Sequence, residues 1–154
     1  MNKTLRTADV NRVFKMINSA KLSKMDDGGK VKVWHICRAF KPVSNKFNED
    51  IEDAKSKFLP YDGFVNDVLR AQEYEQSVGR GDETPKGCTK EEYDKIIADY
   101  KEYTQLIDRV VNDAASKEVE IDVDFLTSDE FDKLCLSNEW TFSEIDSIAD
   151  TVLE

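Results

Sequence analysis

The sequence predicts a mainly helical protein with a minor β element. Three observations lead to this class. The chain of 154 residues contains only 6 Gly and 3 Pro, which favours long regular elements over a turn-rich β-sandwich. Apolar residues recur at every third or fourth position along most of the chain, and one segment near the C-terminus alternates instead. We expect a long antiparallel helical hairpin, at about residues 29–58 and 89–116, inside a single domain of residues 1–154.

Two helices are predicted in the N-terminal part. The first covers residues 8–20, and its apolar positions follow helical spacing: Val10, Val13, Phe14 and Ile17. The second is the long helix 29–58, whose apolar residues keep a three-to-four spacing: Val33, Cys37, Phe40, Val43, Phe47, Ile51, Ala54 and Phe58. The alternation in residues 30–33 also suits a strand, so the start of this helix has two interpretations.

In the middle of the chain, the sequence pattern predicts a short helix, a loop and the second long helix. The short helix begins at Phe64 and is expected to end near Tyr74. Residues 76–88 contain three Gly and one Pro with almost no apolar content, which is typical of a mobile loop. Thr89 and Glu92 then form a capping box, in which each side chain satisfies a free backbone amide at the start of the helix 89–116.

The C-terminal part predicts one strand and a small helical cap. Residues 118–125 alternate acidic and apolar side chains, which indicates a half-buried strand. Its partner is residues 2–6, residues 30–34, or the same strand of a second copy, which would pair through Val119, Ile121 and Val123. Capping boxes at residues 127–130 and 141–144 open two short helices, at 128–136 and 142–153.

The net charge of −10 is unevenly distributed. Residues 1–47 hold 11 Lys and Arg against 3 Asp, a net +8, so residues 48–154 carry −18. Either basic and acidic helices pack against each other, or the basic segment forms a concave site for a phosphate-bearing ligand or for the acidic face of a second copy. A field of −18 would repel a long polyanion, so we expect no extended nucleic-acid binding.

Several classes of function find no support. No apolar run is long enough to span a membrane, and residues 1–6 lack a secretory signal, so we expect a cytoplasmic protein. Three Cys without a CxxC motif and a single His predict neither a metal site nor a bound cofactor. No motif for a nucleophile, a phosphate-binding loop or a metal-dependent hydrolase occurs, so we expect no enzyme, with a small hydrolase as an outside alternative.

One cluster has the chemistry of an anion-binding site. Its members are Lys30, Lys32, Trp34, His35, Arg38 and Lys41. Helical spacing places Trp34, Arg38 and Lys41 on one stripe, so an aromatic plane for stacking lies next to cations for phosphate contact. Gly28 and Gly29 precede it, and a helix N-terminus there would add a favourable dipole. In the alternative interpretation Trp34 belongs to the core, and the cations face solvent or pair with the acidic helix 89–116.

The layout of the chain resembles a class of small helical proteins of tailed-bacteriophage genomes. A strand-like start leads into a helix (Lys3-Thr-Leu-Arg-Thr-Ala-Asp-Val-Asn-Arg-Val-Phe), two long charged helices follow, and the alternating segment Val119-Glu-Ile-Asp-Val-Asp-Phe-Leu precedes Leu134 and a helical cap. The resemblance covers most of the chain in layout and carries no diagnostic motif. It implies a protein made in the cytoplasm of an infected bacterium, and it supplies no active site.

These observations predict a non-enzymatic binding protein of a phage that acts in the host cytoplasm. We expect it to inhibit an anti-phage defence, either by sequestering an anionic, nucleotide-like signal or by occluding a defence protein. The alternative is a factor or chaperone for virion assembly, of the tail or the head, which the helical hairpin and the unpaired strand would suit. A strand that needs a partner also favours a homo-oligomer.

Overall fold

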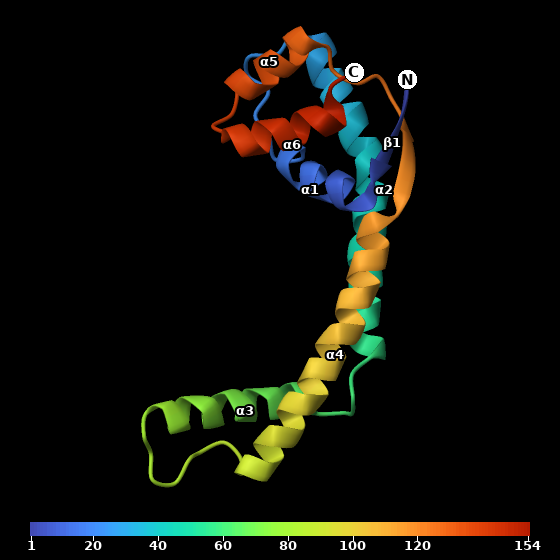
Figure 1. Cartoon of the computed structure of the whole chain (residues 1–154). Helices are drawn as coiled ribbons and strands as arrows, with labels where there is room; N and C mark the ends of the chain where they lie inside the picture. The colour runs from blue at the N-terminus through green and yellow to red at the C-terminus, as the bar shows by residue number, and fades with distance from the viewer. The chain divides into compact units, whose positions relative to one another are not determined.

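The computed structural model describes residues 1–154, and it is mainly helical with one small sheet, as the sequence predicts (Figure 1). Six helices and two strands follow one another in the order β1 (Asn2–Arg6), α1 (Thr7–Ile17), α2 (Asp27–Lys57), α3 (Phe64–Gly79), α4 (Lys90–Ser116), β2 (Glu118–Asp122), α5 (Ser128–Leu136) and α6 (Phe142–Val152). None of the helices combines the length and the apolarity that crossing a membrane requires.

Internal contacts divide the chain into two compact units. The terminal unit comprises residues 1–50 and 112–154, and the central unit comprises residues 51–111. The long helices α2 and α4 contribute residues to both units. In the central unit the hydroxyl of Tyr103 on α4 donates to the carbonyl of Lys55 on α2, at 2.9 Å. The two predicted hairpin helices therefore lie side by side there, while the single domain stays a prediction.

The terminal unit is built on one apolar core, whose buried members come from α1, the segment before α2, α2, β2, the segment after β2, α5 and α6. They are Val10, Val13, Ile17, Met25, Val33, Ile36, Phe40, Ile121, Phe125, Leu126, Phe131, Leu134, Ile148 and Val152. Each of these helices is amphipathic, and its apolar stripe faces this common core because burial removes that stripe from water. Figure 1 shows α1, α5 and α6 gathered beside the small sheet.

The small sheet joins two segments from opposite ends of the chain. β1 and β2 pair antiparallel, with Lys3 opposite Ile121 and Leu5 opposite Val119. Of the three expected partners for the C-terminal strand, residues 2–6 are therefore the one that pairs within the chain. Residues 30–34 lie in α2, so the strand interpretation of that segment is wrong: their alternate positions follow the helical period of the long apolar stripe.

Three expected boundaries differ from the structure. The C-terminal strand ends at Asp122 instead of residue 125, because the chain turns there and buries Phe125 and Leu126 in the core. Helix α1 ends at Ile17, three residues early. Helix α3 extends to Gly79, beyond the expected end near Tyr74. Other ends agree to within two residues.

Side-chain caps account for the helix starts that were predicted well. Thr127 and Thr141 each accept a hydrogen bond from the backbone amide three residues later, and Glu130 and Glu144 bond back to the amides of these threonines. The backbone amide of Glu92 donates to Thr89 at 3.1 Å in the same way. Capping boxes act over four residues, so no tertiary contact is needed to place them.

The central unit has few buried apolar residues and many polar ties. Phe64 is buried in it, and its ring makes edge contacts with those of Tyr61 and Tyr103, at 5.5 and 5.6 Å between centroids. Arg70 of α3 donates to Asp67, to Glu92 of α4 and to the carbonyl of Gly87.

Buried Ser77 ties the segment between α3 and α4 to α3. Its hydroxyl donates to Asp82 at 2.7 Å and accepts from the backbone amide of Lys86 at 2.9 Å. Ser77 is 0% exposed, because residues 82–86 fold over it. This cover explains why α3 continues past Tyr74, since its last turn has a buried side to pack.

Candidate ligand-binding groove

A groove of about 530 Å³ lies between α1 and α2 in the terminal unit. Phe14, Asn18, Trp34, Cys37, Arg38, Lys41, Pro42 and Asn45 line it. Three of the six residues predicted for an anion site, Trp34, Arg38 and Lys41, are therefore on one surface. Positions 34, 38, 41 and 45 share a face of α2, because steps of three and four residues return to the same side of a helix.

Trp34 is a surface residue, so the alternative that placed it in the core is wrong. Its side chain is 56% exposed. The guanidinium carbon of Arg38 lies 5.2 Å from the centroid of the indole, which is a cation–π contact. The ring of His35 meets the indole edge-on, at 4.9 Å and an interplanar angle of 67°. These two neighbours hold Trp34 in an orientation that leaves indole surface open to solvent.

The two cations of the groove have no carboxylate partner. Arg38 and Lys41 form none of the ion pairs of the protein, and the groove has no acidic lining residue. Both side chains are exposed, so the groove presents two cations whose charge no carboxylate neutralises. The interpretation in which these cations pair with the acidic helix 89–116 does not hold for Arg38 and Lys41.

Lys32 lies on another face of α2 and has a different role. Its ammonium donates to Glu130 of α5 at 2.7 Å, and both side chains are largely buried. This hydrogen bond raises the pKa of Lys32. Partial burial pushes the pKa of Glu130 upward, but hydrogen bonds from Lys32 and Thr127 outweigh it and hold that pKa below its ordinary value. Lys32 therefore forms an ion pair that ties α2 to α5, and it does not line the groove.

Lys30 and His35 also remain outside the groove lining. Lys30 is exposed on the first turns of α2, and His35 contributes only through its contact with Trp34. The expected dipole contribution is absent as well. The carboxylate of Asp26 already accepts from the amide of Gly29 at 2.8 Å, and Trp34 lies roughly 10 Å further along the helix at 1.5 Å per residue.

Five groove residues were not in the predicted site: Phe14, Asn18, Cys37, Pro42 and Asn45. Phe14 and Cys37 had been assigned to apolar stripes, and they lie at the edge of those stripes, half-buried. Asn18 and Asn45 could not be predicted, because a single surface Asn does not contribute to any apolar pattern. Burial raises the pKa of the Cys37 thiol, which makes it a poor nucleophile. The groove therefore offers the exposed indole of Trp34, the half-buried ring of Phe14, two cations and two amides.

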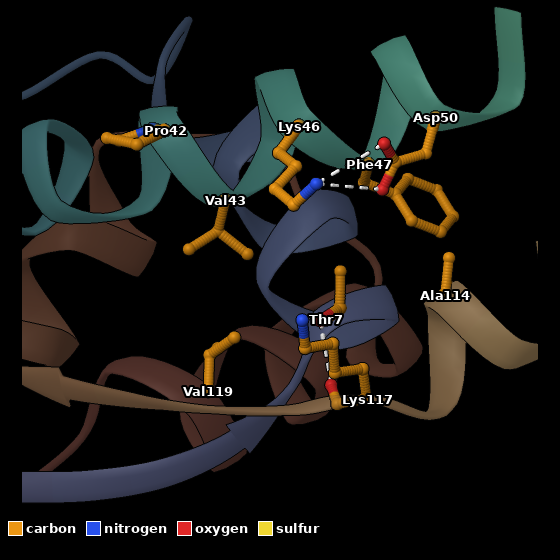
Figure 2. Close-up of a pocket in the computed structure, with 9 residues that line it drawn as sticks. All are labelled: Thr7, Pro42, Val43, Lys46, Phe47, Asp50, Ala114, Lys117 and Val119. Carbon is orange, nitrogen blue, oxygen red and sulfur yellow. Dashed lines mark hydrogen bonds and ion pairs between the residues drawn. The ribbon is translucent and has the colours of Figure 1, made fainter. Parts of the chain in front are cut away.

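A second, apolar pocket of about 300 Å³ lies on the other side of α2 and shares only Pro42 with the groove (Figure 2). Val43 and Phe47 of α2, Ala114 of α4 and Val119 of β2 supply its apolar walls. Thr7, Lys46, Asp50 and Lys117 complete the lining. Sequence periodicity gave no indication of this pocket, because it forms where four separate elements meet: α1, α2, α4 and β2.

No group of three or more His, Cys, Asp or Glu side chains is arranged to hold a metal ion. Comparison with protein-family models, with curated proteins and with solved structures gives no match to this chain.

Proposed function

We propose that this chain is a non-enzymatic binding protein that captures a small anionic ligand of the nucleotide class in the groove between α1 and α2. One observation carries the proposal: an exposed indole and two cations without counter-ions line the same groove. Stacking on Trp34 suits an aromatic base, and Arg38 with Lys41 suits a phosphate.

Each part of a nucleotide would have its own partner among the groove residues. A base that stacks on an aromatic side chain gains about 1–3 kcal/mol. The guanidinium of Arg38 binds phosphate oxygens in a fork, and Lys41 adds a point charge one helical turn away. Asn18 and Asn45 each offer an amide that can both donate to and accept from a base edge or a ribose.

A protein with these binding groups and no catalytic motif would act by sequestration. Together with the layout resemblance to proteins of tailed phages, this favours an inhibitor of bacterial anti-phage defence, made by the phage and acting in the host cytoplasm. Lowering the free concentration of a nucleotide-like defence signal would require no turnover. Occlusion of a defence protein is the other form of the same role.

The test compares a groove variant with a charge-matched control. Native mass spectrometry with an extract of infected, defence-competent cells identifies a retained ligand, and calorimetry with that ligand gives its Kd. We expect Arg38→Ala with Lys41→Ala to weaken binding at least tenfold. Lys21→Ala with Lys24→Ala removes the same two charges outside the groove lining and should leave the Kd within about twofold.

Two outcomes would contradict the proposal. Retention of no small molecule by the wild-type protein is one, and an equal loss of binding in both double variants is the other, since that would mean that net charge alone attracts the ligand.

Virion assembly is the second candidate, and a different observation favours it. Leu136 and Phe142, which flank the turn between α5 and α6, are 75% and 88% exposed. Large apolar side chains this exposed suit an anchor for a protein partner. The strand that had suggested assembly already pairs with β1, so pairing of Val119, Ile121 and Val123 with a second copy stays a prediction for its outer edge. Co-purification with phage structural proteins that Phe142→Ser abolishes would support this candidate.

A further inference from the structure

The apolar pocket in Figure 2 has the composition of a small-ligand site, independent of the groove at Trp34. Its volume of about 300 Å³ lies at the lower end of the range for small-molecule sites. Since a water molecule takes up about 30 Å³ of liquid, the pocket holds roughly ten non-hydrogen atoms. Four apolar side chains of the lining belong to α2, α4 and β2, so regular structure holds their positions.

Two polar groups of the lining, those of Thr7 and the Lys117 backbone, are already paired with each other. The backbone amide of Thr7 donates to the carbonyl of Lys117 at 2.8 Å, and the Thr7 hydroxyl donates to the same oxygen at 2.7 Å. Figure 2 draws this contact as a dashed line between Thr7 and Lys117. The part of a ligand that reaches these groups finds no free donor on Thr7 and a carbonyl oxygen of Lys117 that already accepts two hydrogen bonds, so apolar atoms suit it best.

The remaining polar groups of the lining carry a net positive charge. The lining contains two ammonium groups, those of Lys46 and Lys117, and one carboxylate, that of Asp50. The Lys46 ammonium lies 3.3 and 3.4 Å from the two oxygens of Asp50, longer than the roughly 2.7–2.9 Å of a strong charge-assisted bond. Lys117 makes no ion pair. An ammonium has three N–H donors, so Lys46 keeps at least one donor free beside the apolar walls.

From this inventory we propose that the pocket binds a compact amphipathic monocarboxylate, such as a medium-chain fatty acid. The aliphatic tail lies against Val43, Phe47 and Val119, and the carboxylate accepts from the ammonium of Lys46. A neutral apolar molecule would fill the same space and leave these donors to water. An anion without a tail would leave the apolar walls exposed. Only a ligand with both parts uses everything that the lining offers.

A titration with octanoate, which has ten non-hydrogen atoms, tests this site directly. Methyl signals of Val43, Ala114 and Val119 are followed by NMR in the full chain, at concentrations below micelle formation. We expect saturable shifts confined to these methyl groups, and binding at least fivefold weaker for 1-octanol, which has the same tail and no charge. Trp34→Ala, which changes only the groove, should leave octanoate binding unchanged.

Two variants separate the tail from the head group. Ala114→Leu adds atoms to the wall of the pocket and should abolish binding of both octanoate and 1-octanol. Lys46→Gln changes an exposed side chain that the fold does not require, and should weaken octanoate at least threefold without affecting 1-octanol. This second variant keeps the test decisive if Ala114→Leu fails to fold.

The proposal is overturned if octanoate causes no saturable shift at these methyl groups. It is also overturned if 1-octanol binds as tightly as octanoate, or if the shifts map to the groove at Trp34. Shifts at these methyl groups that appear only when a protein partner is added would assign the pocket to an apolar side chain of that partner instead.

Discussion

The two units of this protein hold themselves together in different ways. The terminal unit has a continuous core of fourteen buried apolar residues from seven elements and segments. The central unit buries only Ala54, Phe64, Ala71 and Ile96 among its apolar residues. It relies instead on hydrogen bonds around Arg70 and Ser77. Apolar burial is non-directional and shared among many residues, whereas each polar tie depends on two specific groups.

This difference predicts where each unit is vulnerable. Removing one buried ring from the terminal unit costs burial and leaves a cavity, but pH has little effect on such contacts. In the central unit, the loss of a single donor leaves its partner unsatisfied, and titration of a carboxylate breaks several ties together.

The largest expected effect is that of Phe40→Ala. Phe40 is 0% exposed in the core of the terminal unit, so the variant should lose about 3–5 kcal/mol of unfolding free energy. Urea unfolding followed by circular dichroism measures this loss. Phe142→Ala is the matched control, because its ring is 88% exposed and its removal should change stability by no more than about 0.5 kcal/mol. Similar losses in both variants would contradict a core centred on Phe40.

In the central unit, Gly87→Ala should be the most damaging single change. Gly87 has φ of +93°, and an added Cβ would lie 2.4 Å from the carbonyl oxygen of Arg70. Gly81→Ala is the control, since φ is +77° there and no atom lies within 4 Å of the new Cβ. The left-handed conformation alone costs about 1–2 kcal/mol in both variants.

The clash should add about 1–3 kcal/mol to the cost in Gly87→Ala only. Amide hydrogen exchange in α3 measures the effect within the central unit. Equal protection in the two variants would mean that the close approach to Arg70 has no energetic weight.

A smaller loss is expected for Ser77→Ala. The variant removes the acceptor of the Lys86 amide and the donor to Asp82, at a cost of about 1–3 kcal/mol for the buried groups left unpaired. Faster hydrogen exchange should be confined to residues 77–89. Ser23→Ala is a control, because Ser23 is exposed and forms no side-chain hydrogen bond. Uniformly faster exchange across both units would contradict a local role for Ser77.

Acid should loosen the central unit before the terminal unit. Hydrogen bonds from Tyr61, Ser77 and Arg70 lower the pKa values of Asp67, Asp82 and Glu92, respectively. A carboxyl whose folded pKa is depressed stabilises the folded state above its ordinary value, near roughly pH 4, and loses this contribution as pH falls through the depressed value. Hydrogen exchange measured between pH 5 and pH 2.5, corrected for intrinsic rates, compares the two units.

High pH should also destabilise the central unit, in this case through the loss of phenol protons. Tyr61 donates to Asp67 and Tyr93 donates to Glu75, which raises the pKa of each phenol to about 12. Their stabilising effect is complete below roughly pH 10 and is lost as pH rises toward 12. Tyr61→Phe should remove part of this dependence, and an unchanged alkaline profile in that variant would contradict the role of the Tyr61 hydroxyl.

Much of the local structure was predictable because its causes lie within a few residues. The capping boxes at Thr89, Thr127 and Thr141 and the apolar stripes of the long helices placed most boundaries to within two residues. The end of α3 was misplaced because Ser77 is buried by residues 82–86, and a polar residue gives no periodic sign that a loop will cover it.

The candidate site was predicted in part. Helical spacing alone placed Trp34, Arg38 and Lys41 on one face of α2. The same spacing could not tell that Lys32 pairs with Glu130, because the two residues are 98 positions apart in the chain. The exposure of Trp34 depends equally on where α1 packs.

The sequence by itself determined the helical class, the positions of most helices and the basic character of the first 47 residues, because propensity, periodicity and capping act over one or two turns. Only the tertiary structure decided that β2 pairs with residues 2–6, that the groove forms between α1 and α2, and that an apolar pocket opens beside Val119. These features arise where segments distant in sequence meet, and such meetings depend on how whole apolar faces pack together.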